Sequence, residues 1–268
     1  MRVMNVVLSS APRGANQRCL LSSYLEPAAK AKLRVAVFGS FMGGYHVLKE
    51  LLLGELAGQV QIVGVATDDP TQPFTHPNVR LWKYPHTRDD ELLVPRFARD
   101  HGLPVFDGRV KSPEFLDRFF NEWQPDHCLM ATFGQKIPNA LISYPSRGFY
   151  NFHHSSDTWP SYPGPDPIAA MVRDGRKHLV LTFHRVTDVI DGGEFVARSH
   201  SVAIPAGVNA VEMHRITGPQ MGPFIRREVA TILHAVACVP MSVPLLLQEK
   251  PAEYRTACRW ECAHRIAA

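Results

Sequence analysis

Residues 33–67 read LRVAVFGSFMGGYHVLKELLLGELAGQVQIVGVAT, and this stretch decides the fold. Residues 33–39 are mostly apolar and β-branched and end at Gly39, as a buried strand does. A glycine-rich segment, 40–44, follows, and residues 45–56 then carry apolar side chains at helical spacing. A second apolar run covers 61–67. The order strand, turn, helix, strand predicts a βαβ unit with two parallel strands.

The same alternation continues to residue 132. Helical periodicity covers 91–101 and 113–123, and short strand-like runs cover 103–106 and 125–132. The pattern predicts an α/β fold with a doubly wound, mostly parallel sheet. In such sheets ligands bind beyond the carboxyl ends of the strands. We expect segments 39–44, 133–138 and 151–153 at that edge.

The glycine-rich segment has two interpretations. Its glycine spacing does not match the dinucleotide fingerprint, so a nicotinamide site is not favoured. A tight turn between strand and helix is the simpler interpretation. The alternative is that free backbone N–H groups at the start of the helix receive an anionic group of a substrate.

Composition and charge limit the class of protein. The chain has 268 residues, of which 45% are hydrophobic and 20% charged, as in ordinary globular proteins. Its apolar runs are too short for a membrane helix. The net charge is +4, and residues 1–32 hold five Lys or Arg against one Glu, so the rest is formally neutral. A neutral body does not favour a nucleic-acid partner.

The five cysteines include no Cys-x-x-Cys pair. This usage favours a reducing, cytoplasmic location over a disulfide framework. Cys258, Cys262 and His264 lack a fourth ligand at a usual spacing, so we predict no metal site.

Three polar residues supply the groups that acyl transfer to an amine needs. Asn151 and His153 lie in the stretch NFHHSS, and Asp191 begins an Asp-Gly-Gly turn. An amide donates to a developing oxyanion, an imidazole donates or moves a proton, and a carboxylate orients the imidazole and favours its charged form. Taken singly, each has a plainer interpretation as a hydrogen-bonded loop residue or as turn chemistry. Together they predict an enzyme.

Several short motifs occur in an order that resembles one family. They are VAVFG at 35–39, HGLPVF at 101–106, FGQKIP at 133–138, GFYNFH at 148–153 and DGG at 191–193. Between residues 33 and 235 the chain resembles the catalytic domain of the folate-dependent formyltransferases. These include methionyl-tRNA formyltransferase, glycinamide ribonucleotide transformylase, formyltetrahydrofolate hydrolase and the sugar N-formyltransferases. The resemblance implies a Rossmann-like fold.

The resemblance also implies residue roles and a co-substrate. Asn151, His153 and Asp191 match the catalytic residues of the family, and the formyl donor is 10-formyltetrahydrofolate. Two loops match those whose backbone groups hold the pterin ring. The residues predicted to bind this co-substrate are Phe133, Gly134, Gln135, Lys136, Ile137, Val186, Val189 and Ile190.

The acceptor side departs from the family pattern. The segment 155–160 is two residues longer than the usual Ser-Leu-Leu-Pro, and Pro163 stands where an arginine is common. We expect specificity to lie in three segments: the 39–44 turn, the Pro- and His-rich loop 71–88 and the enlarged segment 155–164. Their predicted substrate-binding residues are Gly39, Ser40, Phe41, Met42, Gly43, Trp82, Tyr84, Ser155 and Trp159.

These observations predict an N-formyltransferase acting on an amine or hydroxylamine of a small metabolite, such as an amino sugar nucleotide or an amino-acid derivative. The family's transfer-RNA enzyme has a further C-terminal barrel, which the residues after 235 are too few to form. Hydrolysis of the same formyl-folate and a non-catalytic folate-binding module are the alternatives. The predicted organisation is an N-terminal extension, 1–32, a catalytic domain, 33–235, and a short tail, 236–268. A homodimer is left open.

Overall fold

The computed structural model describes residues 31–69, 86–164 and 166–237. The chain divides into two units, 1–31 and 32–268, and nearly all of the described structure belongs to the second. Trp82, Tyr84 and the residues weighed as metal ligands, Cys258, Cys262 and His264, lie outside the described residues.

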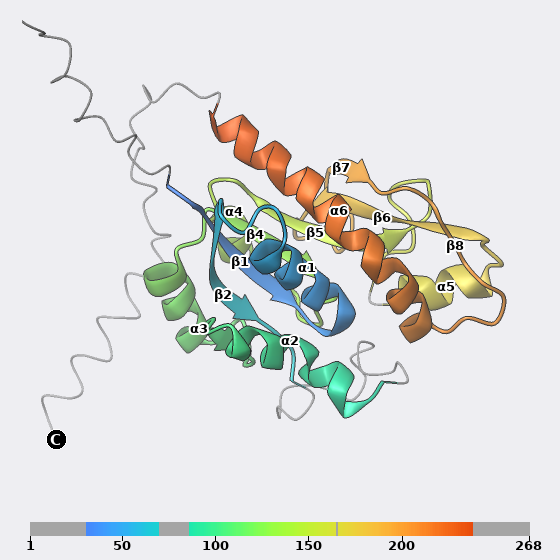
Figure 1. The fold of residues 1–268 in the computed structure, drawn as a ribbon, viewed down its shortest axis with the longest axis horizontal. Coiled ribbons are helices and arrows are strands. Elements are labelled where there is room, and N and C mark those ends of the chain that lie inside the picture. The colour runs from blue at the N-terminus through green and yellow to red at the C-terminus, as the bar shows by residue number, and fades with distance from the viewer. Residues whose placement is uncertain (1–30, 70–85, 165, 238–268) are drawn as a thin grey trace, which may run out of the picture. The chain divides into compact units, whose positions relative to one another are not determined.

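The described chain forms one sheet covered by helices on both faces (Figure 1). Its strands are β1 (Leu33–Gly39), β2 (Val60–Ala66), β3 (Val105–Phe106), β4 (His127–Ala131), β5 (Phe149–Ser155), β6 (His178–Arg185), β7 (Phe195–Arg198) and β8 (Val202–Ala203). Its helices are α1 (Phe41–Leu53), α2 (Arg88–Asp100), α3 (Pro113–Asp117), the π-helical turn η2 (Arg118–Trp123), α4 (Asn139–Ser143), α5 (Pro167–Arg173) and α6 (Ala210–Ala237).

The sheet has the order β3-β2-β1-β4-β5-β6-β7, and β8 pairs with β6. The pairs from β3 through to β5 are parallel, whereas β5 with β6 and β6 with β7 are antiparallel. The prediction of a doubly wound, mostly parallel α/β sheet is confirmed. The antiparallel pairs involve β6, β7 and β8, which lie after residue 132 and therefore outside the segment whose pattern predicted the parallel sheet.

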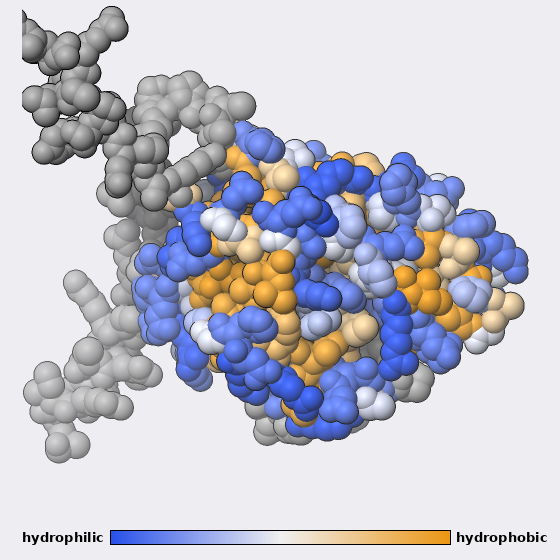
Figure 2. Space-filling model, viewed as in Figure 1, coloured by the Kyte–Doolittle hydropathy of each residue, from blue (hydrophilic) through white to orange (hydrophobic). Residues whose placement is uncertain are grey.

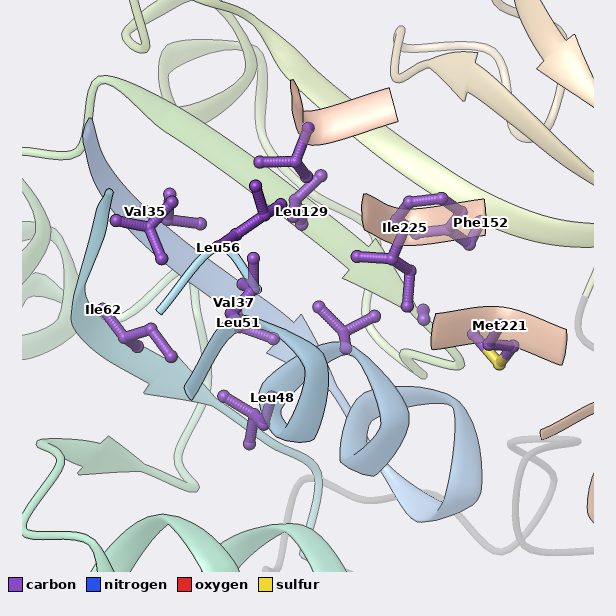
Figure 3. Close-up of a cluster of buried hydrophobic side chains, with 14 of the residues drawn as sticks. Val35, Val37, Leu48, Leu51, Leu56, Ile62, Leu129, Phe152, Met221 and Ile225 are labelled. Carbon is purple, nitrogen blue, oxygen red and sulfur yellow. The ribbon is translucent and has the colours of Figure 1, made fainter. Parts of the chain in front are cut away.

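Alternating side chains of β1 supply both halves of the core. Val35 and Val37 face α1, α2 and α6, and Figure 3 shows both in one cluster with Leu51 of α1 and Ile225 of α6. Ala36 and Phe38 face the opposite layer, formed by α3, η2 and α4. All four residues are fully buried. A strand covered on both faces needs an almost continuous apolar run, which is what the sequence of β1 shows.

The outer surface of the α1 and α6 face is mostly hydrophilic, with apolar areas among the charged ones (Figure 2). Within the described residues, no helix is both long and apolar enough to cross a bilayer.

Helix α1 begins earlier than the sequence predicts. Gly43 and Gly44, expected in a loop, lie in its first turn because the helix crosses the sheet at very short range. A Cβ atom at Gly43 would lie 2.3 Å from Thr132 Oγ1, and one at Gly44 would lie 2.6 Å from Gly39 C. The two glycines therefore allow backbone to pack against backbone, which supports the simpler of the two interpretations of this segment.

Gly44→Ala is therefore expected to lower the free energy of unfolding by about 1–3 kcal/mol, because the methyl group would meet rigid backbone of β1. Urea unfolding followed by circular dichroism measures the change. Gly58→Ala is the matched control, since a Cβ atom there has nothing within 4 Å. The control is expected to stay within about 0.5 kcal/mol of the unsubstituted protein. Equal effects of the two changes would contradict the close-packing explanation.

Candidate active site

A cavity of about 430 Å³ opens beyond the carboxyl end of β4 and alongside the middle of β5. A volume of roughly 300–1,000 Å³ is usual for sites that hold small molecules. The cavity is lined by the segment after β4, by the middle of β5, by the end of β6 and the turn after it, and by single residues of α5 and α6. All eight residues predicted to bind the co-substrate line it: Phe133, Gly134, Gln135, Lys136, Ile137, Val186, Val189 and Ile190.

The three predicted catalytic residues meet in this cavity. Asn151 Nδ2 donates to Asp191 Oδ1 at 3.2 Å. His153 Nδ1 lies 3.7 Å from the same oxygen. Asn151 and His153 are two residues apart on β5, so their side chains share one face of the sheet. Asp191 arrives from the turn after β6, where it adopts a left-handed conformation with φ of 48°.

The glycines after Asp191 let this turn fold back tightly on β6. A Cβ atom at Gly193 would lie only 1.8 Å from the Arg185 carbonyl oxygen. No side chain fits there without moving the backbone. The Asp-Gly-Gly sequence therefore has a structural reason in addition to its predicted catalytic one.

His184 is a fourth polar residue of the cavity to which the sequence analysis gave no role. It pairs directly opposite Asn151 in the antiparallel β5–β6 ladder. Its Nδ1 lies 3.0 Å from the Arg185 carbonyl oxygen, which can only accept, so Nδ1 carries the proton in the neutral ring. Its Nε2 then accepts from Asn151 Nδ2 at 3.2 Å. The two amide hydrogens of Asn151 are thus directed at Asp191 and His184.

The partners of His153 fix its proton in the same way. His153 Nε2 lies 2.9 Å from the Tyr162 carbonyl oxygen and must donate to it. In the neutral ring, Nδ1 is therefore a free acceptor that faces Asp191. Burial lowers the pKa of His153 more than the Asp191 charge and the Tyr162 carbonyl raise it, and nearby His184 adds to the lowering. The site thus favours the neutral imidazole, whereas we expected the charged one; the difference comes from burial.

Asp191 is held in its ionised form. Burial alone would raise the pKa of Asp191, but the neighbouring His184 and His153 side chains and the Gly164 N–H together lower it. Gly164 N donates to Asp191 Oδ2 at 2.8 Å. The nearby carboxylate of Asp188 is exposed and does not line the cavity, so Asp191 is the one placed at the site.

The enlarged segment 155–164 packs against His184 and against the turn that carries Asp191. Trp159 Nε1 donates to the Gly193 carbonyl oxygen at 3.0 Å, and its ring lies 4.6 Å from that of His184. The predicted acceptor residue Trp159 packs behind His184 and does not line the cavity. Ser155 is fully buried and hydrogen-bonded to Thr182, so it does not reach the cavity either.

The predicted acceptor residues of the 39–44 segment are also set back from the cavity. Gly39 and Gly43 pack against backbone and Thr132, and the Ser40 hydroxyl is hydrogen-bonded to Asp68. Phe41 and Met42 line a separate small cavity of about 20 Å³. This space shares Thr132 and His214 with the main cavity.

Two further histidines, His154 and His214, line the cavity. His154 Nε2 lies 3.1 Å from Thr217 Oγ1, and its ring stands edge-on to His214 at 4.6 Å. Burial lowers the pKa of His214 to about 4 and, together with the other histidines, that of His154 as well. Both line the cavity as neutral rings. In the described part of the chain, no group of His, Cys, Asp and Glu side chains is placed to hold a metal ion.

Comparison with known proteins identifies the family. Residues 33–217 match the family model described as Formyl transferase. The chain belongs to this family. The resemblance found in the sequence is therefore confirmed.

Curated relatives include methionyl-tRNA formyltransferases. The protein of Syntrophomonas wolfei is 26% identical over 177 residues, which cover 66% of this chain and 52% of the relative. That of Halalkalibacterium halodurans is 33% identical over 102 residues, covering 38% of this chain and 31% of the relative. The chain thus aligns with about half or less of the length of these relatives.

Solved structures share the fold. The phosphoribosylglycinamide formyltransferase of Anaplasma phagocytophilum has a TM-score of 0.59 at 18% identity, over 76% of this chain and 89% of that one. A formyltetrahydrofolate deformylase of Pseudomonas syringae has a TM-score of 0.57 at 20% identity, over 77% of this chain and 63% of that one.

The electrostatic coupling of His153 to Asp191 is testable without any substrate. Asp191 raises the pKa of His153, so Asp191→Asn is expected to lower that pKa further and to shift the protonation of His153 to more acidic pH. A titration of imidazole resonances by NMR measures this, with the His153 signal assigned by its loss in His153→Gln. Asp188→Asn should leave the titration unchanged. An upward shift in Asp191→Asn would show that the carboxylate does not favour the imidazolium.

Proposed function

We propose that the protein transfers the formyl group of 10-formyltetrahydrofolate to an amine or hydroxylamine of a small metabolite. The observation that carries this proposal is the convergence of Asn151, His153 and Asp191 in one cavity, between two loops able to hold the donor. Family membership supports formyl transfer as the reaction class.

The donor side of the proposal rests on the 133–137 and 186–190 loops. A pterin edge presents alternating hydrogen-bond donors and acceptors, which backbone N–H and C=O groups can match without charged side chains. Val189 and Ile190 are 61% and 59% exposed. Such exposure of apolar side chains at the rim of a cavity suits contact with a flat ring system.

The chemical step uses the polar groups as follows. The neutral amine attacks the formyl carbon, a carbon–nitrogen bond forms, and an oxyanion develops on the formyl oxygen. Asn151 stabilises this charge by exchanging one of its present hydrogen bonds, to Asp191 or His184, for one to the oxyanion. The amine loses one proton. Either of two neighbouring acceptors, His153 Nδ1 or Asp191 Oδ1, takes it up. That proton is returned to the departing folate nitrogen as its bond to carbon breaks.

The acceptor side is proposed as the part of the cavity lined by Pro167 and the pair His154 and His214. With both histidines neutral, these residues carry no fixed charge. The acceptor is accordingly proposed to be a small molecule whose reactive amine enters uncharged. Amino sugar nucleotides and amino-acid derivatives both satisfy this requirement. A nucleic-acid partner is not proposed, and the cytoplasmic location and a homodimer stay predictions.

An amine panel assayed with 10-formyltetrahydrofolate tests the function. We expect tetrahydrofolate to be released only when an acceptor is added, with a matching formylated product identified by mass spectrometry. Release at the same rate without any amine would instead establish hydrolysis, which the fold shared with a deformylase makes the relevant alternative. Binding of folate without turnover of any amine or of water would favour a binding module.

Single substitutions test the roles of the catalytic residues. Asn151→Ala, His153→Ala and Asp191→Ala are each expected to lower kcat about a hundredfold or more, because each removes a group that acts on the transition state. Binding of a folate should change little, which isothermal titration calorimetry checks. Asp188→Ala is the matched control and should be nearly as active as the unsubstituted protein, since Asp188 is exposed. An inactive Asp188→Ala beside an active Asp191→Ala would reverse the carboxylate assignment.

A thermal-shift experiment separates folate from nucleotide cofactors. A ligand that binds only the native state raises the melting temperature by mass action. We expect a folate analogue to do so and NAD not to do so. Protection by NAD without protection by any folate would remove the basis of the proposed function.

A further inference from the structure

We propose that Asp68 is a positioning residue for the folate donor: it anchors the 133–137 loop by hydrogen bonds and so sets the affinity for the donor without touching the reacting atoms. The inference rests on the proposed function, because it takes this loop to be the one that holds the pterin. Asp68 follows β2 and does not line the cavity.

Three donors from two distant segments converge on the Asp68 carboxylate. Gly134 N donates to Oδ2 at 2.6 Å, and the Ser40 hydroxyl donates to the same oxygen at 3.0 Å. Gln135 Nε2 donates to Oδ1 at 3.3 Å. The backbone N–H of Asp68 in turn donates to Ser40 Oγ at 3.0 Å. One buried side chain thus ties the ends of β1 and β2 to the segment that follows β4.

Gln135 carries the network one step further. Its Oε1 accepts from Val110 N at 3.0 Å, and its Nε2 also donates to the Gly108 carbonyl oxygen at 3.1 Å. These contacts fix the amide orientation, because a flipped amide would set N–H against N–H at Val110 and oxygen against oxygen at Gly108. The Gln135 amide therefore presents an N–H donor to Asp68 in one orientation only.

The environment of Asp68 makes the arrangement costly to disturb. The residue is 7% exposed. Burial raises the pKa of Asp68 to about 6, and the hydrogen bonds from Gly134, Ser40 and Gln135 oppose that rise. Among the described residues, the groups hydrogen-bonded to the carboxylate are the Ser40 hydroxyl, the Gly134 N–H and the Gln135 amide, none of which titrates near neutral pH. Hydrogen bonds to a buried charge are stronger than those between neutral groups.

Asp68→Asn isolates this role, since it keeps the shape of the side chain and exchanges one acceptor oxygen for a donor. The introduced amide meets a donor at either Gly134 or Gln135, and Gln135 is unable to flip in response. We expect the dissociation constant of 5-formyltetrahydrofolate, a stable isomer of the donor, to rise about tenfold by isothermal titration calorimetry. The KM for the donor should rise in parallel, while kcat at saturating donor and the KM for the acceptor change less than about twofold.

A second-site variant separates positioning from general destabilisation. In Asp68→Asn/Gln135→Glu, the new amide faces a new carboxylate, which still accepts from Val110 N but sets its other oxygen against the Gly108 carbonyl. Folate affinity is expected to recover in part. Asp107→Asn is the matched control, because Asp107 lies at the same edge of the sheet in a solvent-exposed ion pair with Arg99. Its affinity for the folate should not change.

The outcomes distinguish this inference from the function on which it rests. Failure of the unsubstituted protein to bind 5-formyltetrahydrofolate would overturn the proposed function, and the inference with it. Binding by the unsubstituted protein that Asp68→Asn leaves unchanged would overturn the role of Asp68 alone. Equal rises in the KM values of donor and acceptor would also overturn it, since they would indicate a general loss of structure.

Discussion

The candidate site depends on one constraint, which is that the Asp191 carboxylate stays ionised although its side chain is only 10% exposed. Burying a carboxylate is unfavourable unless hydrogen-bond donors replace the lost water. Here Gly164 N and Asn151 Nδ2 serve as those donors, and they come from two other parts of the chain. The turn after β6, the middle of β5 and the segment before α5 are thus held together by one charge.

The change from parallel to antiparallel pairing at β5 brings these parts together. β6 begins at the carboxyl edge, beside the end of β5, and runs back toward the start of β5. Because β6 runs antiparallel, its end lies beside β5 in a register that sets His184 opposite Asn151. Strand β6 ends at Arg185, opposite Tyr150 near the start of β5, and the turn that follows brings Asp191 back to Asn151. The second half of the sheet is therefore what completes the polar cluster.

Much of this arrangement is readable from the sequence because its signals are local. The buried strands, the segments at the carboxyl edge and the polar residues Asn151, His153 and Asp191 all follow from short patterns. The start of α1 was placed too late because Gly43 and Gly44 look like a loop in isolation. Their reason for being glycine is a contact with Gly39 and Thr132 across the sheet, which no local pattern contains.

The same limit explains why the supporting residues were missed. Asp68 and Gly134 are separated by 66 positions along the chain, and their hydrogen bond leaves no periodic mark in the sequence. Trp159 carried a signal, as an aromatic residue in a loop near the site. The signal did not distinguish packing behind His184 from contact with a substrate.

The carboxylates of Asp68 and Asp191 are held in different ways, and the difference fits their proposed roles. Asp191 has two imidazoles within 4 Å of its Oδ1, and its pKa is lowered. Asp68 has only hydrogen-bond donors around it in the described structure, and its pKa is raised to about 6. A group that accepts a proton during reaction benefits from partners that share protons, as imidazoles do. A carboxylate that only holds a loop in place needs hydrogen-bond donors in fixed positions, and backbone N–H and side-chain amide groups provide them.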